Sequence, residues 1–188
     1  MSECSSGWYI FGAQAVQIWG KPRLTADVDV TARLGKADHT AFVSRMRRSG
    51  FDLRVRDIDG FVRRTRVLPF VHRGSDIPVD GVLAGPGLED EFLERAKLVD
   101  VGGATVPVIS AEDLIVTKML AGRPKDIEDV RGILRALLDK LDLRRVRRLL
   151  RLLERAIGQD DLASGFGKEL AAARRKRRAR LPPPRGKD

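Results

Sequence analysis

The sequence predicts an α+β protein, because strand patterns gather in its first part and helical patterns in its second. Short apolar or alternating segments recur up to residue 109, and the Gly102-Gly103 pair is typical of a tight hairpin turn between the last two. Longer segments with helical spacing of apolar residues begin at Ser110. We therefore expect a mixed β-sheet flanked by helices, followed by a C-terminal helical region.

The same shift in pattern sets the expected domain boundaries. We expect a core over residues 1–109, a helical region that completes the site over 110–173, and a flexible, basic, proline-containing tail over 174–188. The tail starts with an arginine-rich run and ends beyond three consecutive prolines, which stop a helix.

Each expected element has a local reason. An apolar run at 8–11 and a small-residue turn precede a short helix at 14–19. The helix at 36–49 carries an apolar stripe and ends at Gly50, a residue favoured at helix C-caps. Ser110-Ala-Glu-Asp113 resembles a capping box and begins a helix that ends near Gly122. The other expected strands are 28–32, 51–56, 67–72, 77–83, 97–101 and 104–109, and the other helices are 57–64, 88–95, 126–138, 143–157 and 160–178.

The charge balance favours a polyanionic partner. Lysine and arginine outnumber acidic residues 36 to 26, which gives a formal charge of +10. Arginine-rich surfaces attract phosphates over long range, so nucleic acid is the partner class we expect. A protein that is merely basic is the alternative, because charge alone specifies no partner.

The cysteine count and the hydropathy pattern favour a cytoplasmic protein. Cys4 is the single cysteine, so no internal disulfide can form, as is usual in a reducing compartment. The sequence has no secretory signal and no apolar run of about 18 residues, which disfavours secretion and membrane spanning. Its two histidines and one cysteine disfavour a structural zinc site, which needs four such ligands.

Two aspartates in a β-branched run are the main candidates for chemistry. Asp27 and Asp29 alternate with Val28 and Val30, so a strand would place both carboxylates on one face. Paired carboxylates suit a hard cation such as Mg²⁺. Upstream, Gly12 and Ala13 open a short helix, whose N–H groups favour an anion such as a phosphate. Together these segments describe a site for a nucleoside triphosphate and its metals.

The segment from Phe11 to Asp29 resembles motif I of the DNA-polymerase-β-like nucleotidyltransferases, and it is closest to the AbiEii-type minimal members. Their pattern is approximately hydrophobic-Gly-(Gly/Ser/Ala)-x-Ala, then Gly-x-x-Arg-x-Thr-x-Asp-x-Asp. Ala13 departs from it, because many members carry Gly or Ser there. The matching residues are Gly12, Ala15, Gly20, Arg23, Thr25, Asp27 and Asp29.

The resemblance implies two Mg²⁺ ions and a third carboxylate on a later strand. Asp80, in an apolar context, is our candidate, and Asp76 is the alternative at the loop end. Asp27 and Asp29 would then hold the metal that bridges the triphosphate. All three carboxylates would hold the second metal, with Asp80 favouring deprotonation of the acceptor hydroxyl.

Four further residues are predicted to bind the nucleotide. Arg23 would touch the triphosphate or the acceptor, and Thr25 would donate to a phosphate or order the loop; a purely structural loop is the alternative for both. The resemblance implies that Lys118 contacts the triphosphate and that Asp126 orients the basic groups around it. An ion pair between two helices is the alternative for Lys118, since a buried lysine needs an anion.

Two basic segments complete the set of candidates. The 143–157 helix has an apolar stripe and an arginine-rich remainder, which indicates either ordinary packing with a solvated face or a ridge that guides RNA. The run at 174–180 would bind phosphate backbones or act as a solubilising tail.

The resemblance implies a Mg²⁺-dependent enzyme that transfers NMP from an NTP to an acceptor hydroxyl. The expected acceptor is the 3′ end of tRNA, and the expected role is the toxin of a toxin–antitoxin pair with a cognate antitoxin as partner. Transfer to an aminoglycoside-like small molecule or to a protein is one alternative. A catalytically silent RNA-binding module is another.

Overall fold

The computed structural model describes residues 5–34 and 39–179, and the chain divides into two compact units. The sheet unit contains Met1–Gln17 and Arg23–Ser110, and the helical unit contains Ile18–Pro22 and Ala111–Asp188. Three features of the sequence lie outside the described residues. They are Cys4, the expected start of a helix at Lys36, and the proline-containing end after Arg180.

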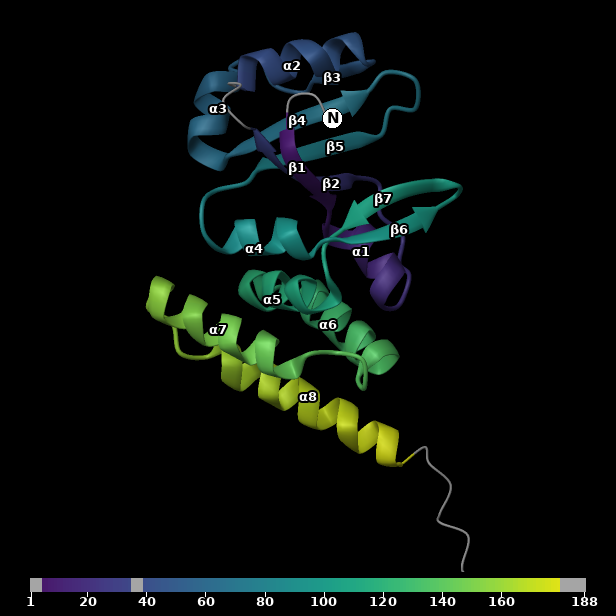
Figure 1. Ribbon diagram of the computed structural model, residues 1–188, viewed down its shortest axis with the longest axis vertical. Coiled ribbons are helices and arrows are strands. Elements are labelled where there is room, and N and C mark those ends of the chain that lie inside the picture. The colour runs from purple at the N-terminus through teal and green to yellow at the C-terminus, as the bar shows by residue number, and fades with distance from the viewer. Residues whose placement is uncertain (1–4, 35–38, 180–188) are drawn as a thin grey trace, which may run out of the picture. The chain divides into compact units, whose positions relative to one another are not determined.

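The sheet unit is built on one seven-stranded mixed sheet with the order β3-β4-β5-β2-β1-β7-β6 (Figure 1). β2 pairs in parallel with β5, and β1 pairs in parallel with β7, whereas the remaining neighbours are antiparallel. This architecture confirms the α+β class. The strands are β1 Ser5–Ile10, β2 Val28–Leu34, β3 Phe51–Leu53, β4 Val67–His72, β5 Pro78–Leu83, β6 Lys97–Val101 and β7 Ala104–Val108.

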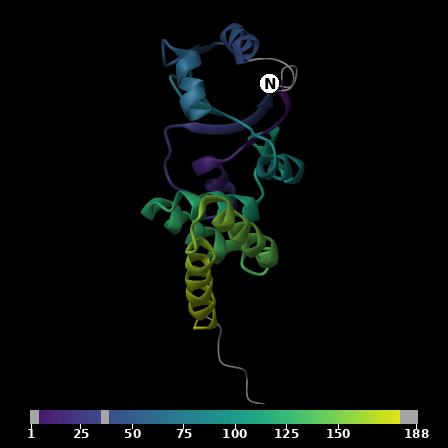
Figure 2. The ribbon, with the colours of Figure 1, turned by 90° about the vertical axis from the view of Figure 1, so that its left-hand side faces the viewer.

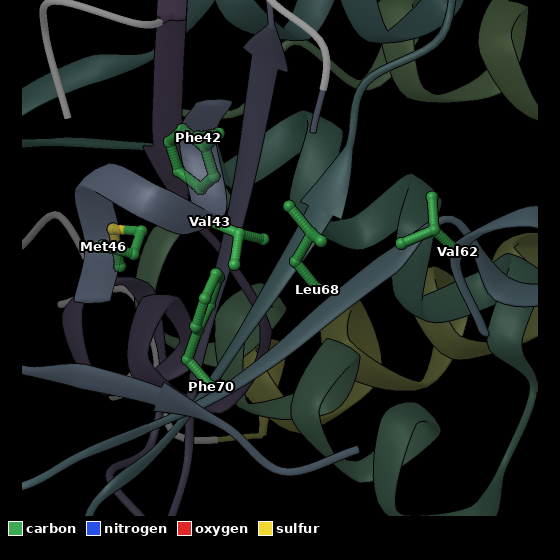
Figure 3. Packing of buried hydrophobic residues seen from close by; sticks show 6 residues of the cluster. All are labelled: Phe42, Val43, Met46, Val62, Leu68 and Phe70. Carbon is green, nitrogen blue, oxygen red and sulfur yellow. The ribbon is translucent and has the colours of Figure 1, made fainter. Parts of the chain in front are cut away.

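Helices α2 (His39–Arg48) and α3 (Ile58–Thr65) cover one face of this sheet. Figure 3 shows the contact, in which Phe42, Val43 and Met46 of α2 lie over Leu68 and Phe70 of β4. The apolar stripe predicted for the 36–49 helix is therefore the buried face of α2. Because side chains alternate along a strand, Val30 and Val79 join this core and their neighbours point to the opposite face.

The opposite face carries α4 (Leu88–Arg95), which packs against β1. Gly7 of β1 has no side chain, and a Cβ there would lie 3.5 Å from Leu93 of α4. Arg33 of β2 also forms an ion pair with Asp90 of α4. This face holds the carboxylates of β2 and β5, and α1 (Gly12–Trp19) begins one residue after β1 ends.

The helical unit contains α5 (Ala111–Ala121), α6 (Pro124–Leu137), α7 (Leu143–Ile157) and α8 (Leu162–Arg178), with α7 and α8 side by side in Figures 1 and 2. α7 has the predicted bounds. It begins where the Asp142 carboxylate accepts hydrogen bonds from the N–H groups of Arg144 and Arg145, both at 3.0 Å. α8 continues through Arg178, so the first residues of the expected tail are helical.

The remaining predicted elements agree with the structure except at their ends. The hairpin at Gly102-Gly103 is present between β6 and β7. The third expected strand stops at Leu53, and Asp27 lies just before β2 rather than inside it. None of the helices in the described ranges is both long enough and apolar enough to cross a membrane.

Candidate active site

Strand pairing brings Asp29 and Asp80 together on one face of the sheet. β2 and β5 run in parallel with Asp29 directly opposite Asp80, and Val28 and Val30 lie opposite Val79 and Gly81. Directly paired residues of neighbouring strands share a face, and such strands lie about 4.8 Å apart. Two carboxylates this close repel one another, so this position favours a bound cation.

Gly12 fits closely against Asp29. Gly12 has a φ of +62°, and a Cβ built on it would lie 1.8 Å from the Asp29 carboxylate oxygen Oδ2. The backbone N–H of Phe11 donates to the Asp29 carbonyl at 3.0 Å. The Asp29 carboxylate therefore lies beside the N-terminus of α1, where the helix dipole favours negative charge. A glycine is required here for two reasons, the left-handed backbone and the absence of a side chain.

The loop before β2 holds Asp27 in place. The Thr25 hydroxyl donates to the Asp27 carboxylate, and the Gln14 side-chain amide donates to the Asp27 carbonyl at 3.4 Å. Thr25 thus has the loop-ordering contact that was one of its two expected roles. Asp27 itself is half-buried.

Arg54, which the sequence analysis did not select, forms an ion pair with Asp80. Its backbone N–H donates to the Pro69 carbonyl at 2.9 Å, and its Nε donates to the Phe70 carbonyl at 3.0 Å. Pro69 lies directly opposite Asp80 in the sheet, so the guanidinium reaches across β4 to the carboxylate. Alternation in the 51–56 segment placed Arg54 on a polar face, but the order of β3, β4 and β5 was needed to find its partner.

The structure also places the other predicted site residues of the sheet unit, Arg23, Ala13 and Asp76. Arg23 is half-buried in the loop between α1 and β2, and its carbonyl accepts from the Gln17 amide at 3.4 Å. Ala13 is buried at the start of α1. Asp76, the alternative third carboxylate, is exposed in the β4–β5 turn with a φ of +53°. Its place outside both strands separates it from the Asp29–Asp80 pair.

The aspartate oxygens of this site are of the kind that a hard cation prefers, although the carboxylates do not converge on a single position. Across the described ranges, no group of three or more His, Cys, Asp or Glu side chains is arranged to hold a metal ion. Asp29 and Asp80 nevertheless share a face and offer only oxygen ligands. The Arg54 guanidinium occupies the place of a counter-ion at Asp80.

Lys118 and Asp126 belong to a buried ion cluster inside the helical unit. Lys118 Nζ lies 3.0 Å from Asp126 Oδ1 and 2.8 Å from Asp129 Oδ2, and these side chains are 7%, 0% and 5% exposed. Arg123 adds a contact from its Nε to Asp126 Oδ2 at 2.5 Å. The anion that Lys118 requires is thus supplied by α6. This arrangement matches the alternative of an ion pair between helices, and contact with a triphosphate stays a prediction.

The charges of this cluster are mutually stabilised. Burial alone would raise the pKa of Asp126, but hydrogen bonds from Arg123 and Lys118 outweigh it and hold this pKa below its usual range. Asp126 therefore stays ionised until the pH falls through that lowered value. A second buried pair joins α5 to α7, where Arg145 Nε donates to Asp113 Oδ1 at 2.9 Å.

Comparison with known families identifies the class of protein. Residues 39–161, well over half of the chain, match a family described as "Nucleotidyltransferase of unknown function (DUF6036)". The chain belongs to this family and is therefore a nucleotidyltransferase. The match begins after the Asp27–Asp29 segment and includes Asp80, Lys118 and Asp126.

Two solved structures are similar to this chain at low sequence identity. The solution structure of the antibiotic-resistance factor ANT(2″)-Ia is 14% identical over 92% of this chain and 88% of that chain, with a TM-score of 0.49. An antigenic nucleotidyltransferase-like protein from Paracoccidioides brasiliensis is 18% identical over 85% and 84%, with a TM-score of 0.48. A search of curated proteins gave no match. The family assignment rests on the family match alone.

Proposed function

We propose that this enzyme transfers NMP from an NTP to an acceptor hydroxyl at the Asp29–Asp80 face of the sheet unit. The parallel register that sets Asp29 opposite Asp80 is the observation that carries the proposal. In the transfer, the acceptor oxygen forms a bond to the α-phosphorus, the bond to pyrophosphate breaks, and the acceptor loses its proton. Such transfer depends mainly on positioning and on neutralising charge.

The residues divide these tasks between them. Asp27, Asp29 and Asp80 would hold Mg²⁺, which supplies neutralising charge to the triphosphate and lowers the pKa of a bound hydroxyl. Thr25 and Gln14 orient Asp27 through their hydrogen bonds. Gly12 and Ala13, at the start of α1, would offer N–H groups to a phosphate, and Arg23 would bind the triphosphate or the acceptor. Lys118 and Asp126 remain candidates for nucleotide binding through the family resemblance.

The narrower form of the proposal names RNA as the acceptor, with the 3′ end of tRNA as the expected site of addition. The charge of +10 supports a polyanionic acceptor and opposes a cationic, aminoglycoside-like one. Action as the toxin of a toxin–antitoxin pair rests on the resemblance of the 11–29 segment to AbiEii-type proteins. Transfer to a small molecule or a protein is an outcome that the experiment below distinguishes.

The test is transfer of label from each of the four α-³²P-labelled NTPs to total RNA, purified tRNA, an aminoglycoside or the protein itself, with Mg²⁺ present. Asp29→Asn and Asp80→Asn should lower transfer by at least about 100-fold, because each removes a charge needed only when the triphosphate reacts. Asp76→Asn is the matched control. It removes the same charge from the exposed β4–β5 turn, and asparagine tolerates the left-handed backbone found there.

Two outcomes would overturn the proposal. One is transfer by Asp29→Asn at the wild-type rate. The other is absence of transfer to every acceptor by a protein whose unfolding temperature Mg²⁺ and NTP fail to raise, since a ligand of the native state must stabilise it. That second outcome would favour a catalytically silent RNA-binding module.

A further inference from the structure

An arginine-lined groove lies between α7 and α8, wholly inside the helical unit. It is a hollow of about 350 Å³. Arg147 lines it from α7, and a single face of α8 lines it from the other side. No carboxylate is among its lining residues, which are Arg147, Gly167, Leu170, Ala171, Arg174, Arg175 and Arg178.

The arginines of this groove are not used to hold the fold together. Within the described ranges, none of Arg147, Arg174, Arg175 and Arg178 forms an ion pair with a carboxylate. Other arginines of the same unit are paired, as Arg131 is with Glu169 and Arg177 is with Asp139. Neighbouring like charges without counter-ions repel one another and so lower the stability of the fold. A bound anion would offset this repulsion.

The spacing of the arginines suits a chain of phosphates better than a single anion. Arg174 and Arg178 are one turn apart, about 6 Å along the axis of α8. Both also line a second hollow of about 360 Å³ beside Leu138 and Asp139, so the basic surface continues past the first groove. Guanidinium groups bind phosphate oxygens in a forked geometry and need no contact with a base. The lining contains no aromatic residue for base stacking, which indicates backbone contacts.

We propose that this α7–α8 groove binds the sugar-phosphate backbone of RNA without sequence specificity. The choice of RNA among polyanions rests on the proposed function, in which RNA supplies the acceptor hydroxyl. The groove belongs to the helical unit, whereas Asp27, Asp29 and Asp80 belong to the sheet unit.

The test measures binding alone, by fluorescence anisotropy of a labelled, unstructured 20-nucleotide RNA with the full chain, without NTP or Mg²⁺. Each single-strand phosphate contact releases about 0.7 counter-ion, which is worth about five-fold in affinity at 0.1 M salt. The Arg147→Gln/Arg174→Gln/Arg178→Gln variant should therefore bind about 100-fold more weakly. The slope of log K against log salt should become shallower by about 2.

Two further variants keep the result interpretable. Arg48→Gln/Arg63→Gln/Arg64→Gln removes the same charge from exposed positions of α2 and α3, and should weaken binding only a few-fold. The groove variant with lysine at 147, 174 and 178 keeps the charge and should bind within a few-fold of wild type. Circular dichroism and the unfolding temperature confirm that each variant is folded.

The proposal is overturned if the folded groove variant binds RNA as well as the α2–α3 control does, or if DNA of the same sequence binds more tightly than the RNA. Its failure is distinguishable from failure of the proposed function. If the groove variant keeps the RNA affinity of the α2–α3 control while the wild-type protein transfers nucleotides, only the groove proposal is contradicted. If RNA binding depends on the groove but no acceptor is labelled, only the proposed enzyme activity is contradicted.

Discussion

The sheet unit and the helical unit use charged residues in opposite ways. In the sheet unit, Asp29 and Asp80 are half-buried and lie opposite one another on neighbouring strands. Gly12 lies against the Asp29 carboxylate, and Arg54 pairs with Asp80. In the helical unit, Lys118 and its aspartates are almost completely buried and bonded to one another. Fully buried charges that bond to one another contribute to the fold, whereas half-buried neighbouring carboxylates that water can reach are suited to a ligand.

The largest expected effect is on the buried cluster. Lys118→Ala leaves Asp126 and Asp129 buried without their shared cation, so the free energy of unfolding should fall by about 3–5 kcal/mol. Chemical denaturation followed by circular dichroism measures it. Lys125→Ala, at an exposed position of α6, is the control and should change stability by less than about 0.5 kcal/mol. A loss below about 1 kcal/mol in Lys118→Ala would show that the cluster is not structural.

The next prediction separates the backbone strain of an alanine at position 12 from its steric overlap with the Asp29 carboxylate. Gly12→Ala places a Cβ on the Asp29 carboxylate and forces alanine into a left-handed conformation, which by itself costs about 1–2 kcal/mol. Gly158→Ala has a similar φ, +69°, with nothing within 4 Å. We expect both variants to lose stability and only Gly12→Ala to lose nucleotidyl transfer. Equal activity in the two variants would contradict the place of Asp29 in the site.

A smaller effect tests the ion pair at Asp80. The Arg54 and Asp80 side chains are 38% and 32% exposed, so Arg54→Gln should lower stability by less than about 1 kcal/mol. Because the guanidinium competes with a metal for the same carboxylate, this variant should bind Mg²⁺ several-fold more tightly, as measured by isothermal titration calorimetry. Arg56→Gln, two residues further along, should leave Mg²⁺ binding unchanged. Weaker Mg²⁺ binding in Arg54→Gln would show that Arg54 supports the metal site instead.

The smallest effect concerns a surface pair of the helical unit. Hydrogen bonds from Arg131 hold the pKa of Glu169 below its usual range, and Arg131 Nε lies 2.7 Å from Glu169 Oε2. A lowered carboxyl pKa adds stability above its unfolded-state value, about 4.3, and that stability is lost as the pH falls through the folded value. Glu169→Gln should therefore be about 0.5–1 kcal/mol less stable than wild type at pH 7, and this difference should shrink as the pH is lowered toward 2.5.

Glu94→Gln, at an exposed position of α4, is the control for this pH dependence. Its stability relative to wild type should be the same at both pH values. A deficit of Glu169→Gln that persists at low pH would mean that its side-chain packing, and not its charge, is responsible.

Local sequence patterns were sufficient to predict most elements and part of the site. The 143–157 helix was predicted from its apolar stripe, and the structure shows that α7 begins at an aspartate cap and ends at a glycine, both of which act within a few residues. Alternation also predicted a common face for Asp27 and Asp29, which stays a prediction because Asp27 lies just before β2. The predicted end of the last helix at residue 178 agrees with α8. The end of β3 at Leu53 was missed, because neighbouring elements decide where a strand stops.

The sequence by itself determined the α+β class, the pair of aspartates near the start of β2, and the excess of positive charge, because composition and short-range periodicity encode them. Only the tertiary structure decided that Asp80 lies opposite Asp29, that Arg54 reaches Asp80, and that Lys118 is enclosed by α6. Strand order, register and burial join residues that are distant along the chain. No local pattern specifies such pairings, since many registers bury similar apolar area and side-chain contacts in the folded core select one of them.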